Sequence, residues 1–336
     1  MVFNIKEKIS ILGAGSWGTT LAILLSKNSD VLLWSPFKED VEEIIKNREN
    51  KIFLPSIKIP ENINISSNLN LALNRDIIII AIPMEYLRNI LKKIRKINIS
   101  LKNKVFLSVI KGIEIKSLKT ASQIITEELN ISKKQIAVLS GPTIAREIAL
   151  GMPAVANIAS SFYPNALRLQ KLFYNTNLRI YTNRDIRGIE IAGALKNIIA
   201  IASGISDGLG FGTNAKSALI CRGLKEILRF ANFFKIKEKV FFGISGIGDL
   251  CTTCFSQFSR NRYVGEMVGK GKKLKDILKD MKMVAEGVPT TKAVYKIAKK
   301  YKIDMPITSQ VYAILYKDKN PKLALKDLMS RPLKEE

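Results

Sequence analysis

The chain of 336 residues contains no histidine. This absence removes every mechanism in which an imidazole acts as acid, base or metal ligand, and it excludes a Ser-His-Asp triad and a His-bound zinc. Cysteine is also scarce, at positions 221, 251 and 254, which excludes a disulfide framework and favours a reducing compartment. Cys251 and Cys254 form a CxxC spacing, but no second pair and no thioredoxin-like context accompany it, so we interpret the spacing as accidental.

Acidic residues are few relative to basic ones, with 29 Asp and Glu against 54 Lys and Arg and a formal net charge of +25. Such a balance is compatible with nucleic acid, anionic membrane surfaces or phosphorylated small molecules as partners. The basic residues are spread along the chain without interleaved aromatics or a known nucleic-acid motif. The charge by itself therefore selects none of these partner classes, although the spread of the basic residues disfavours nucleic acid.

One uncharged stretch, residues 9–26, follows Lys6 and Lys8 in the manner of a signal peptide or a membrane span. Three glycines interrupt it and no small-residue cleavage site follows it. A strand, a tight turn and a helix explain the stretch better. We expect a cytoplasmic protein without an integral membrane segment.

The first half of the chain alternates short β-branched runs with helix-length segments. The run DIIIIAI at 76–82 is almost purely apolar, which is typical of a parallel strand buried on both faces. Beyond about residue 185 the apolar spacing becomes helical, and glycine clusters at 204–212 and 243–248 indicate turns between helices. The expected strands are 8–12, 31–34, 76–82, 104–110 and 135–140, and the expected helices include 19–27, 189–205, 216–230 and 276–282. This pattern predicts a Rossmann-like, doubly wound α/β domain over 1–187 and an all-α domain over 188–336.

The segment Gly13-Ala14-Gly15-Ser16-Trp17-Gly18 is a GxGxxG between an expected strand and an expected helix. Gly13 allows the tight turn, Gly15 lets the backbone approach a pyrophosphate, and Gly18 lets helix and strand pack closely. The motif predicts dinucleotide binding. After the second strand, Ser35-Pro36-Phe37-Lys38 supplies neither the acid expected for NAD nor an arginine for NADP, so the choice between NAD and NADP stays open.

Without histidine, a lysine is the natural proton donor for a nicotinamide enzyme. Lys196 lies in GALKNIIA, an apolar helix in which a lysine without a role is costly to bury; the alternative is a lysine that extends to the rim of the helix. Lys111 directly follows the expected strand at 104–110, where open α/β sheets bind ligands; the alternative is an ordinary loop lysine.

Two further stretches are suited to an anion. Ser140-Gly141-Pro142-Thr143 leads into a helix start at 144–147, whose amides suit a phosphate or a nicotinamide amide. Ser259-Arg260-Asn261-Arg262 offers an arginine that can hold phosphate in fork geometry, or it is simply a basic loop. Asp249, after Gly246-Ile247-Gly248, is placed to hold a catalytic ammonium.

These motifs together resemble a known family. GAGSWGT, KGIE, LSGPTIAREIA, GALKNIIAIASGISDGLGFGTNAKSALI, GISGIGDL, SRNR, VAEGVPTTK and MPIT occur in this order over nearly the whole chain. In this respect the chain is similar to bacterial-type NAD(P)-dependent sn-glycerol-3-phosphate dehydrogenases. The resemblance implies hydride transfer between NAD(P)H and dihydroxyacetone phosphate, a homodimer, and supply of glycerol phosphate to phospholipid synthesis. The sequence departs from relatives at Pro36 and Met84.

The resemblance also assigns roles to residues, with Lys196 as proton donor and acceptor, supported by Lys111 and Asp249. We expect no metal site. The expected cofactor contacts are Gly13, Gly15, Ser16, Trp17, Gly18, Lys111, Ala145, Arg260, Val284 and Glu286. The expected substrate contacts are Lys111, Gly141, Thr143, Lys196, Asp249, Ser259, Arg260 and Asn261.

Three alternatives remain at this point. A related Lys-dependent hydroxyacid or 6-phosphogluconate-type dehydrogenase shares the domain pairing, although GISGIGDL and SRNR are not expected there. A basic nucleic-acid-binding protein is allowed by the charge alone. A Rossmann-type sensor that binds cofactor without catalysis is disfavoured by the joint presence of Lys111, Lys196 and Asp249.

Overall fold

The computed structural model describes residues 6–333 and 335, and these fold into two compact units. Of these residues, the first unit comprises 6–111 together with Thr120–Glu190. The second comprises Gly112–Lys119, 191–333 and 335. Nothing in the sequence pattern predicts that residues 112–119 belong to the second unit.

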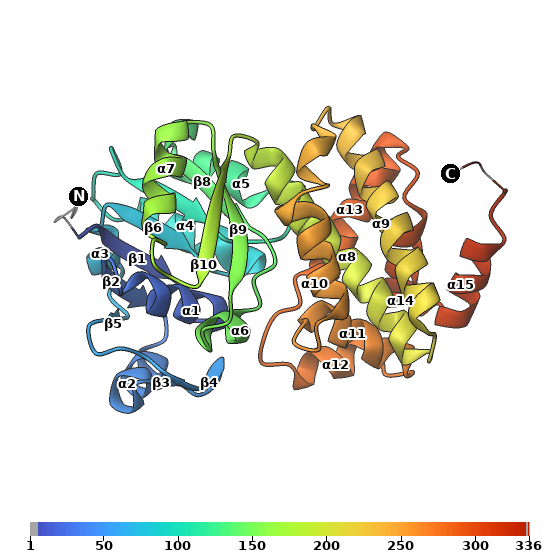
Figure 1. The fold of residues 1–336 in the computed structure, drawn as a ribbon, viewed down its shortest axis with the longest axis horizontal. Helices are drawn as coiled ribbons and strands as arrows, with labels where there is room; N and C mark the ends of the chain where they lie inside the picture. The colour runs from blue at the N-terminus through green and yellow to red at the C-terminus, as the bar shows by residue number, and fades with distance from the viewer. Residues whose placement is uncertain (1–5, 334, 336) are drawn as a thin grey trace. The chain divides into compact units, whose positions relative to one another are not determined.

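The first unit is built on a mostly parallel eight-stranded sheet (Figure 1). The strand order is β10-β9-β8-β7-β6-β1-β2-β5, and neighbours are parallel except for the antiparallel pair β8 and β9. The strands are β1 (Lys8–Leu12), β2 (Asp30–Trp34), β5 (Asn64–Ser66), β6 (Ile77–Ile80), β7 (Val105–Ser108), β8 (Ile136–Ser140), β9 (Ala154–Ser160) and β10 (Leu178–Asn183). A separate antiparallel pair is formed by β3 (Glu49–Asn50) and β4 (Leu54–Lys58).

Alternate residues of the central strands enter two apolar cores, one on each face of the sheet. Ile77 and Ile79 of β6 join the core formed with α1 and α7, whereas Ile78 and Ile80 join the core formed with α4 and α5. The helices of this unit are α1 (Ser16–Leu25), α2 (Lys38–Asn47), α3 (Leu69–Leu73), α4 (Met84–Arg95), α5 (Ala121–Leu129), α6 (Ala145–Ala149) and α7 (Tyr163–Lys171), with a 3₁₀ turn at Lys133–Gln135. The predicted Rossmann-like, doubly wound domain is confirmed.

The five predicted strands correspond to β1, β2, β6, β7 and β8, and the first matches at both ends. Strands β9 and β10 were not predicted. Their sequences, AVANIAS and LRIYTN, mix polar residues into the run, and several of their side chains are half-buried or exposed. The uncharged stretch 9–26 forms β1, a turn and α1, as predicted.

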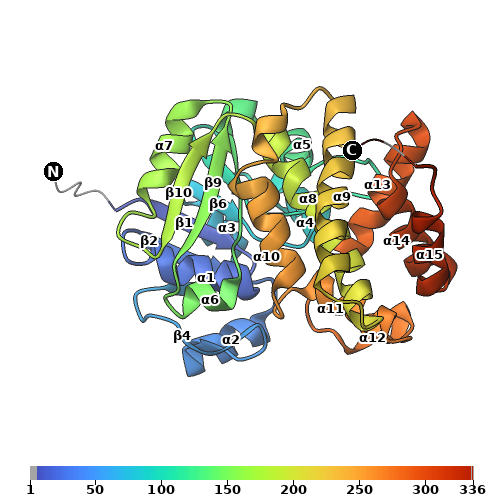
Figure 2. The same cartoon turned by 45° about the vertical axis from the view of Figure 1, so that its right-hand side comes forward.

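The second unit is helical from Ile191 onward, as predicted (Figure 2). Its helices are α8 (Ile186–Gly208, which begins in the first unit), α9 (Thr213–Phe233), α10 (Asp249–Phe255), α11 (Arg260–Gly269), α12 (Leu274–Asp280), α13 (Gly287–Tyr301), α14 (Pro306–Lys317) and α15 (Pro321–Met329), with a 3₁₀ turn at Glu238–Val240. Helix α8 is long and apolar enough to span a membrane by length and composition, but its apolar window is wholly buried in the structure. That burial is typical of the core helix of a globular protein.

The two turn predictions in this unit were correct only in part, because the chain turns at 209–212 and at 241–243 while other glycines of the two clusters lie in helical segments. Gly204 and Gly208 lie inside α8, and the chain turns only after Gly208. Residues Ile244–Gly248 form a π-helical turn that continues directly into α10. Glycine is found both in turns and where two helices pack closely, so a cluster of glycines does not by itself distinguish a turn from a helix contact.

Buried carboxylates hold two helix starts in place. Glu190 accepts a hydrogen bond of 2.8 Å from the backbone N–H of Ser122 at the start of α5. Glu226 of α9 accepts bonds of 2.7 and 2.8 Å from the backbone N–H groups of Ile307 and Thr308 at the start of α14. Burial raises the pKa of both carboxyls, and these hydrogen bonds oppose that rise.

Candidate functional site

The GxGxxG turn lies where the strand order of the sheet reverses. The chain adds β2 and β5 on one side of β1, and β6, β7 and β8 on the other. Open α/β sheets bind ligands outside the carboxyl ends of their strands at such a reversal. Gly13 has a φ of +118°, and a Cβ there would lie 2.6 Å from the Ala81 carbonyl oxygen beyond β6. A Cβ on Gly18 would lie 1.9 Å from the carbonyl oxygen of Gly13, so the fold itself requires both glycines.

Gly15 differs from its two neighbours in the motif. It precedes α1 with an extended backbone (φ −77°, ψ −178°), and a Cβ built on it would meet nothing within 4 Å. The fold therefore does not need a glycine here, whereas a pyrophosphate placed against the backbone does. The first turn of α1 carries no acidic residue, so its N–H groups and the helix dipole favour an anion. Ser16 begins this helix, and Trp17 packs partly buried against the core.

The structure brings Lys111, Gly141 and Thr143 together at the carboxyl ends of β7 and β8. The Nζ of Lys111 donates to the Gly141 carbonyl oxygen at 2.8 Å and to the Thr143 Oγ1 at 3.4 Å. A Cβ on Gly141 would lie 2.8 Å from the Cα of Ala156, so the turn after β8 depends on the missing side chain. These hydrogen bonds hold the Lys111 side chain against the turn that follows β8.

The predicted helix start after Thr143 becomes the short helix α6. Ala145 is its first residue, and its carbonyl oxygen accepts a hydrogen bond of 3.1 Å from the Thr20 Oγ1 of α1. This bond fixes α6 beside the helix that follows the GxGxxG turn. Ala145, predicted as a cofactor contact, thus lies next to the predicted dinucleotide site.

In the second unit, Lys196 is buried and paired. Only 7% of its side chain is exposed, and its Nζ lies 2.9 Å from the Asp249 Oδ1, whose side chain is 2% exposed. The ammonium also donates to the Thr253 Oγ1 at 2.5 Å. The Thr253 hydroxyl in turn donates to the Asp249 carbonyl oxygen at 2.7 Å. Because its proton is used in this bond, the Thr253 oxygen accepts from the Lys196 ammonium through a lone pair. The interpretation of Lys196 as a lysine reaching the helix rim is wrong.

The π-helical turn explains how Asp249 reaches Lys196. A Cβ on Gly246 would lie 2.1 Å from the Phe241 carbonyl oxygen, so this glycine lets the turn wind against the preceding segment. Asp249 then begins α10, and Thr253 follows one turn later on the same face. Thr253 was missed in the sequence, where the segment Cys251-Thr-Thr-Cys254 directs attention to its cysteines. Its spacing of four residues from Asp249 predicts that the two side chains share one face of a helix, and this spacing could have identified Thr253.

Asn261 joins three helices near Lys196. Its Nδ2 donates to the Asn197 Oδ1 of α8 at 2.9 Å, and its Oδ1 accepts from the Gly287 N–H of α13 at 2.8 Å. Asn197, adjacent to Lys196, is a second residue missed in the sequence.

The other predicted residues of this unit flank α11 and α13. Ser259 caps α11 by accepting a bond of 3.2 Å from the Arg262 N–H, and Arg260, the first residue of α11, is exposed. Val284 and Glu286 precede α13 and are half-buried.

The structure of the segment after β2 leaves the choice between NAD and NADP open, as the sequence does. Ser35 is buried, whereas Pro36, Phe37 and Lys38 are exposed at the start of α2. Farther along the first turn of α2, burial and the neighbouring Glu43 and Glu39 raise the pKa of Asp40. Lys38 is thus followed by a cluster of acidic side chains.

Comparison with known protein families agrees with this arrangement. Residues 8–166 match the family model of the NAD-dependent glycerol-3-phosphate dehydrogenase N-terminus, and residues 185–326 match that of the C-terminus. The chain belongs to this glycerol-3-phosphate dehydrogenase family.

Curated family members match over nearly their whole length. The chain is 46% identical to the glycerol-3-phosphate dehydrogenase [NAD(P)+] of Chlorobium phaeobacteroides, covering 98% of this chain and 99% of the relative. It is 43% identical to that of Fusobacterium nucleatum, covering 98% of each. Among solved structures, the glycerol-3-phosphate dehydrogenase of Coxiella burnetii superposes with a TM-score of 0.91 at 34% identity, covering 97% of this chain and 99% of that one.

The glycines of the turn provide a test that separates folding from ligand binding. We expect Gly15→Ala to leave the melting temperature within about 2 °C of wild type, because its Cβ meets open space, and to weaken NADH binding at least about tenfold. Gly18→Ala is the matched control and should lower the melting temperature, since its Cβ meets backbone. Thermal unfolding and NADH fluorescence titration measure the two effects. Unchanged NADH affinity in Gly15→Ala contradicts the assignment.

The cysteines provide a second test, of the interpretation that their spacing is accidental. Burial raises the pKa of Cys254 to about 12, so at pH 8 only about one thiol in ten thousand is ionised. Burial also raises the pKa of Cys251, whereas Cys221 is exposed. Ellman's reagent should therefore modify one thiol rapidly in the native protein, and Cys221→Ser should abolish that phase. Two fast thiols that survive in Cys221→Ser would indicate a reactive pair instead.

Proposed function

We propose that the chain catalyses the interconversion of dihydroxyacetone phosphate and sn-glycerol 3-phosphate with NAD(P)H. The observation that carries the proposal is the buried cluster of Lys196, Asp249 and Thr253 in a member of this family. A buried ammonium is the acid that such a reduction requires when the chain offers no imidazole. Its surroundings hold it at a fixed position before the substrate arrives.

The proposed steps assign each group a role. Bound nicotinamide supplies the hydride to C2 of the substrate. Lys196 gives a proton to the developing C2 alkoxide, Asp249 and Thr253 orient the Lys196 ammonium, and Lys111 adds electrostatic support. In the reverse direction Lys196 accepts the proton.

The cofactor and substrate contacts follow the same assignment. The open face at Gly15 and the acid-free first turn of α1 suit the pyrophosphate, with Ser16 and Trp17 beside it. Ala145, Val284 and Glu286 complete the proposed cofactor contacts. The proposed substrate contacts of the two units are Gly141, Thr143, Ser259, Arg260 and Asn261, where Arg260 holds the substrate phosphate and also reaches the cofactor.

Several broader properties belong to this proposal as well. Residues 1–187 form the cofactor domain and 188–336 the catalytic domain. The enzyme is a cytoplasmic homodimer without nucleic-acid or integral-membrane partners, and its product feeds phospholipid synthesis. The family match argues against the hydroxyacid or 6-phosphogluconate-type alternative. A structure of D-mandelate dehydrogenase, at 16% identity and a TM-score of 0.63, shares the fold alone.

The first experiment follows absorbance at 340 nm with dihydroxyacetone phosphate and either NADH or NADPH. We expect oxidation of the reduced cofactor that depends on the substrate, and the ratio of the two rates measures the preference that Ser35-Pro36-Phe37-Lys38 leaves open. A panel with a hydroxyacid and 6-phosphogluconate is the control. Folded protein that binds cofactor but turns over none of these substrates contradicts the proposal and supports the sensor alternative.

The second experiment removes the proposed proton donor. Lys196→Ala should lower kcat at least about a hundredfold while NADH binding stays near wild type. The exposed Lys225→Ala is the matched control and should be unaffected. Because the single change leaves Asp249 buried without its ammonium, Lys196→Met/Asp249→Asn serves as the folded comparison. Wild-type turnover in either variant would overturn the role of Lys196.

A further inference from the structure

The two arginines of the segment Ser259-Arg260-Asn261-Arg262 lie in different environments. Arg260 is exposed at the first position of α11, in keeping with its proposed contact with the substrate phosphate. Arg262 has a side chain only 16% exposed, and every nitrogen of its guanidinium lies near a protein oxygen. Arg262 therefore does something other than bind substrate.

The guanidinium of Arg262 connects three parts of the second unit. Its Nη1 lies 2.6 Å from the Asp207 Oδ2 near the end of α8. Its Nε donates to the Ser256 carbonyl oxygen at 3.2 Å, and its Nη2 lies 3.1 Å from the Glu266 Oε2 one turn along α11. A planar guanidinium can donate in three fixed directions at once, which a lysine ammonium on a flexible stem does not reproduce.

The same helices approach each other through glycines. A Cβ on Gly204 of α8 would lie 1.9 Å from the Arg262 carbonyl oxygen, and one on Gly208 would lie 2.3 Å from that of Glu266. A Cβ on Gly265 of α11 would lie 2.0 Å from the carbonyl oxygen of Ile201. The two helices thus meet backbone to backbone, and no side chain can act as a spacer between them.

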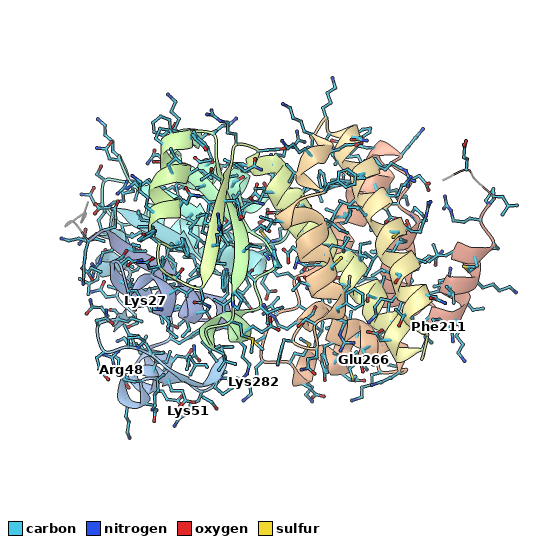
Figure 3. The ribbon with its side chains drawn as sticks, viewed as in Figure 1. Lys27, Arg48, Lys51, Phe211, Glu266 and Lys282 are labelled. Carbon is cyan, nitrogen blue, oxygen red and sulfur yellow. The ribbon has the colours of Figure 1, made fainter. Side chains whose placement is uncertain are left out.

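Helices α8 and α11 run parallel where they cross, because residues later in α8 contact residues later in α11. Asn197 of α8 meets Asn261 of α11, and farther along Gly208 meets Glu266. Figure 3 shows Glu266 and Phe211, which follows α8, at the same end of the helical unit. The parallel crossing accordingly sets the first residues of α11 beside Lys196 and Asn197, at the other end of the contact.

We propose that Arg262 is a positioning residue that, through Asp207 and the Ser256 carbonyl, holds the start of α11 so that Arg260 and Asn261 meet the substrate phosphate. This inference rests on the proposed function, because it concerns the binding of that substrate. The glycine crossing sets the distance between α8 and α11, and the guanidinium fixes the segment from Ser256 to Asn261 against it. Lys196 pairs with Asp249 and Thr253 through contacts other than these, although Ser256 directly follows α10, the helix that carries Asp249 and Thr253.

The inference predicts that KM and kcat respond differently. Arg262→Lys keeps the charge but loses the three-way geometry, so we expect KM for dihydroxyacetone phosphate to rise about tenfold, as misplaced binding groups do. The value of kcat should stay within about threefold of wild type, because the proton donor is untouched. Inorganic phosphate, as a competitive inhibitor, should lose affinity by the same factor as the substrate.

Lys216→Met is the matched control. Lys216 of α9 pairs with the same carboxylate, its Nζ lying 2.7 Å from the Asp207 Oδ1, and its other contact here is with the Phe255 ring, 5.2 Å away at the end of α10. We expect its KM to stay within about twofold of wild type. If Arg262→Lys does not fold, Asp207→Asn replaces it. This variant keeps an oxygen that accepts from Arg262 but removes the charge, and KM should rise about threefold.

The outcomes separate the inference from the proposed function. A parallel rise in KM and in the phosphate inhibition constant, with the melting temperature near that of Lys216→Met, supports the positioning role. A fall in kcat and melting temperature at unchanged KM shows a structural role only and overturns the inference. An equal rise in KM for Lys216→Met also overturns it. Wild-type protein without activity on dihydroxyacetone phosphate overturns the proposed function and this inference with it.

Discussion

The buried ammonium of Lys196 is the constraint on which the second unit depends. A charge removed from water is strongly disfavoured unless an opposite charge and hydrogen-bond acceptors replace its hydration. Asp249 provides the opposite charge and Thr253 a hydrogen-bond acceptor. Both residues lie on α10, which begins directly after the π-helical turn at Ile244–Gly248, and this turn positions α10 beside Lys196. The placement of one ammonium therefore determines the path of the chain from Phe241 to Phe255.

Close backbone approach is the second constraint, and it recurs in both units. At the reversal of the sheet, Gly13 and Gly18 let the turn, the β6 end and α1 pack without intervening side chains. Between α8 and α11, Gly204 and Gly265 do the same for two helices. In each case glycine brings two stretches of backbone together beside residues of the proposed site. Gly15, with open space around it, shows the opposite case of a glycine that the fold alone does not require.

Sequence reasoning identified those features that depend on local pattern. The run at 76–82 predicted β6 because burial on both faces leaves no polar residue in the strand, and Lys196 was conspicuous as a charge in an apolar helix. Thr253 and Asn197 were missed because their partners lie far away in the chain: Thr253 meets Lys196 across 57 residues and Asn197 meets Asn261 across 64. The glycines of α8 were misjudged for the same reason, since only the presence of α11 distinguishes a helix contact from a turn.

The absence of histidine and the cost of the buried pair are connected. Replacing a buried ion pair by apolar residues of similar volume is often neutral or stabilising, so stability alone gives little reason to keep Lys196 and Asp249 in a helix core. An imidazole titrates near neutrality with little help, whereas a lysine depends on its surroundings to act as an acid or base at that pH. A chain that uses lysine for this purpose must therefore hold the ammonium in a rigid and largely dry environment. The pair with Asp249 and the Thr253 hydroxyl form such an environment, and the proposed role of Lys196 as proton donor gives a reason for an arrangement that folding energetics alone does not explain.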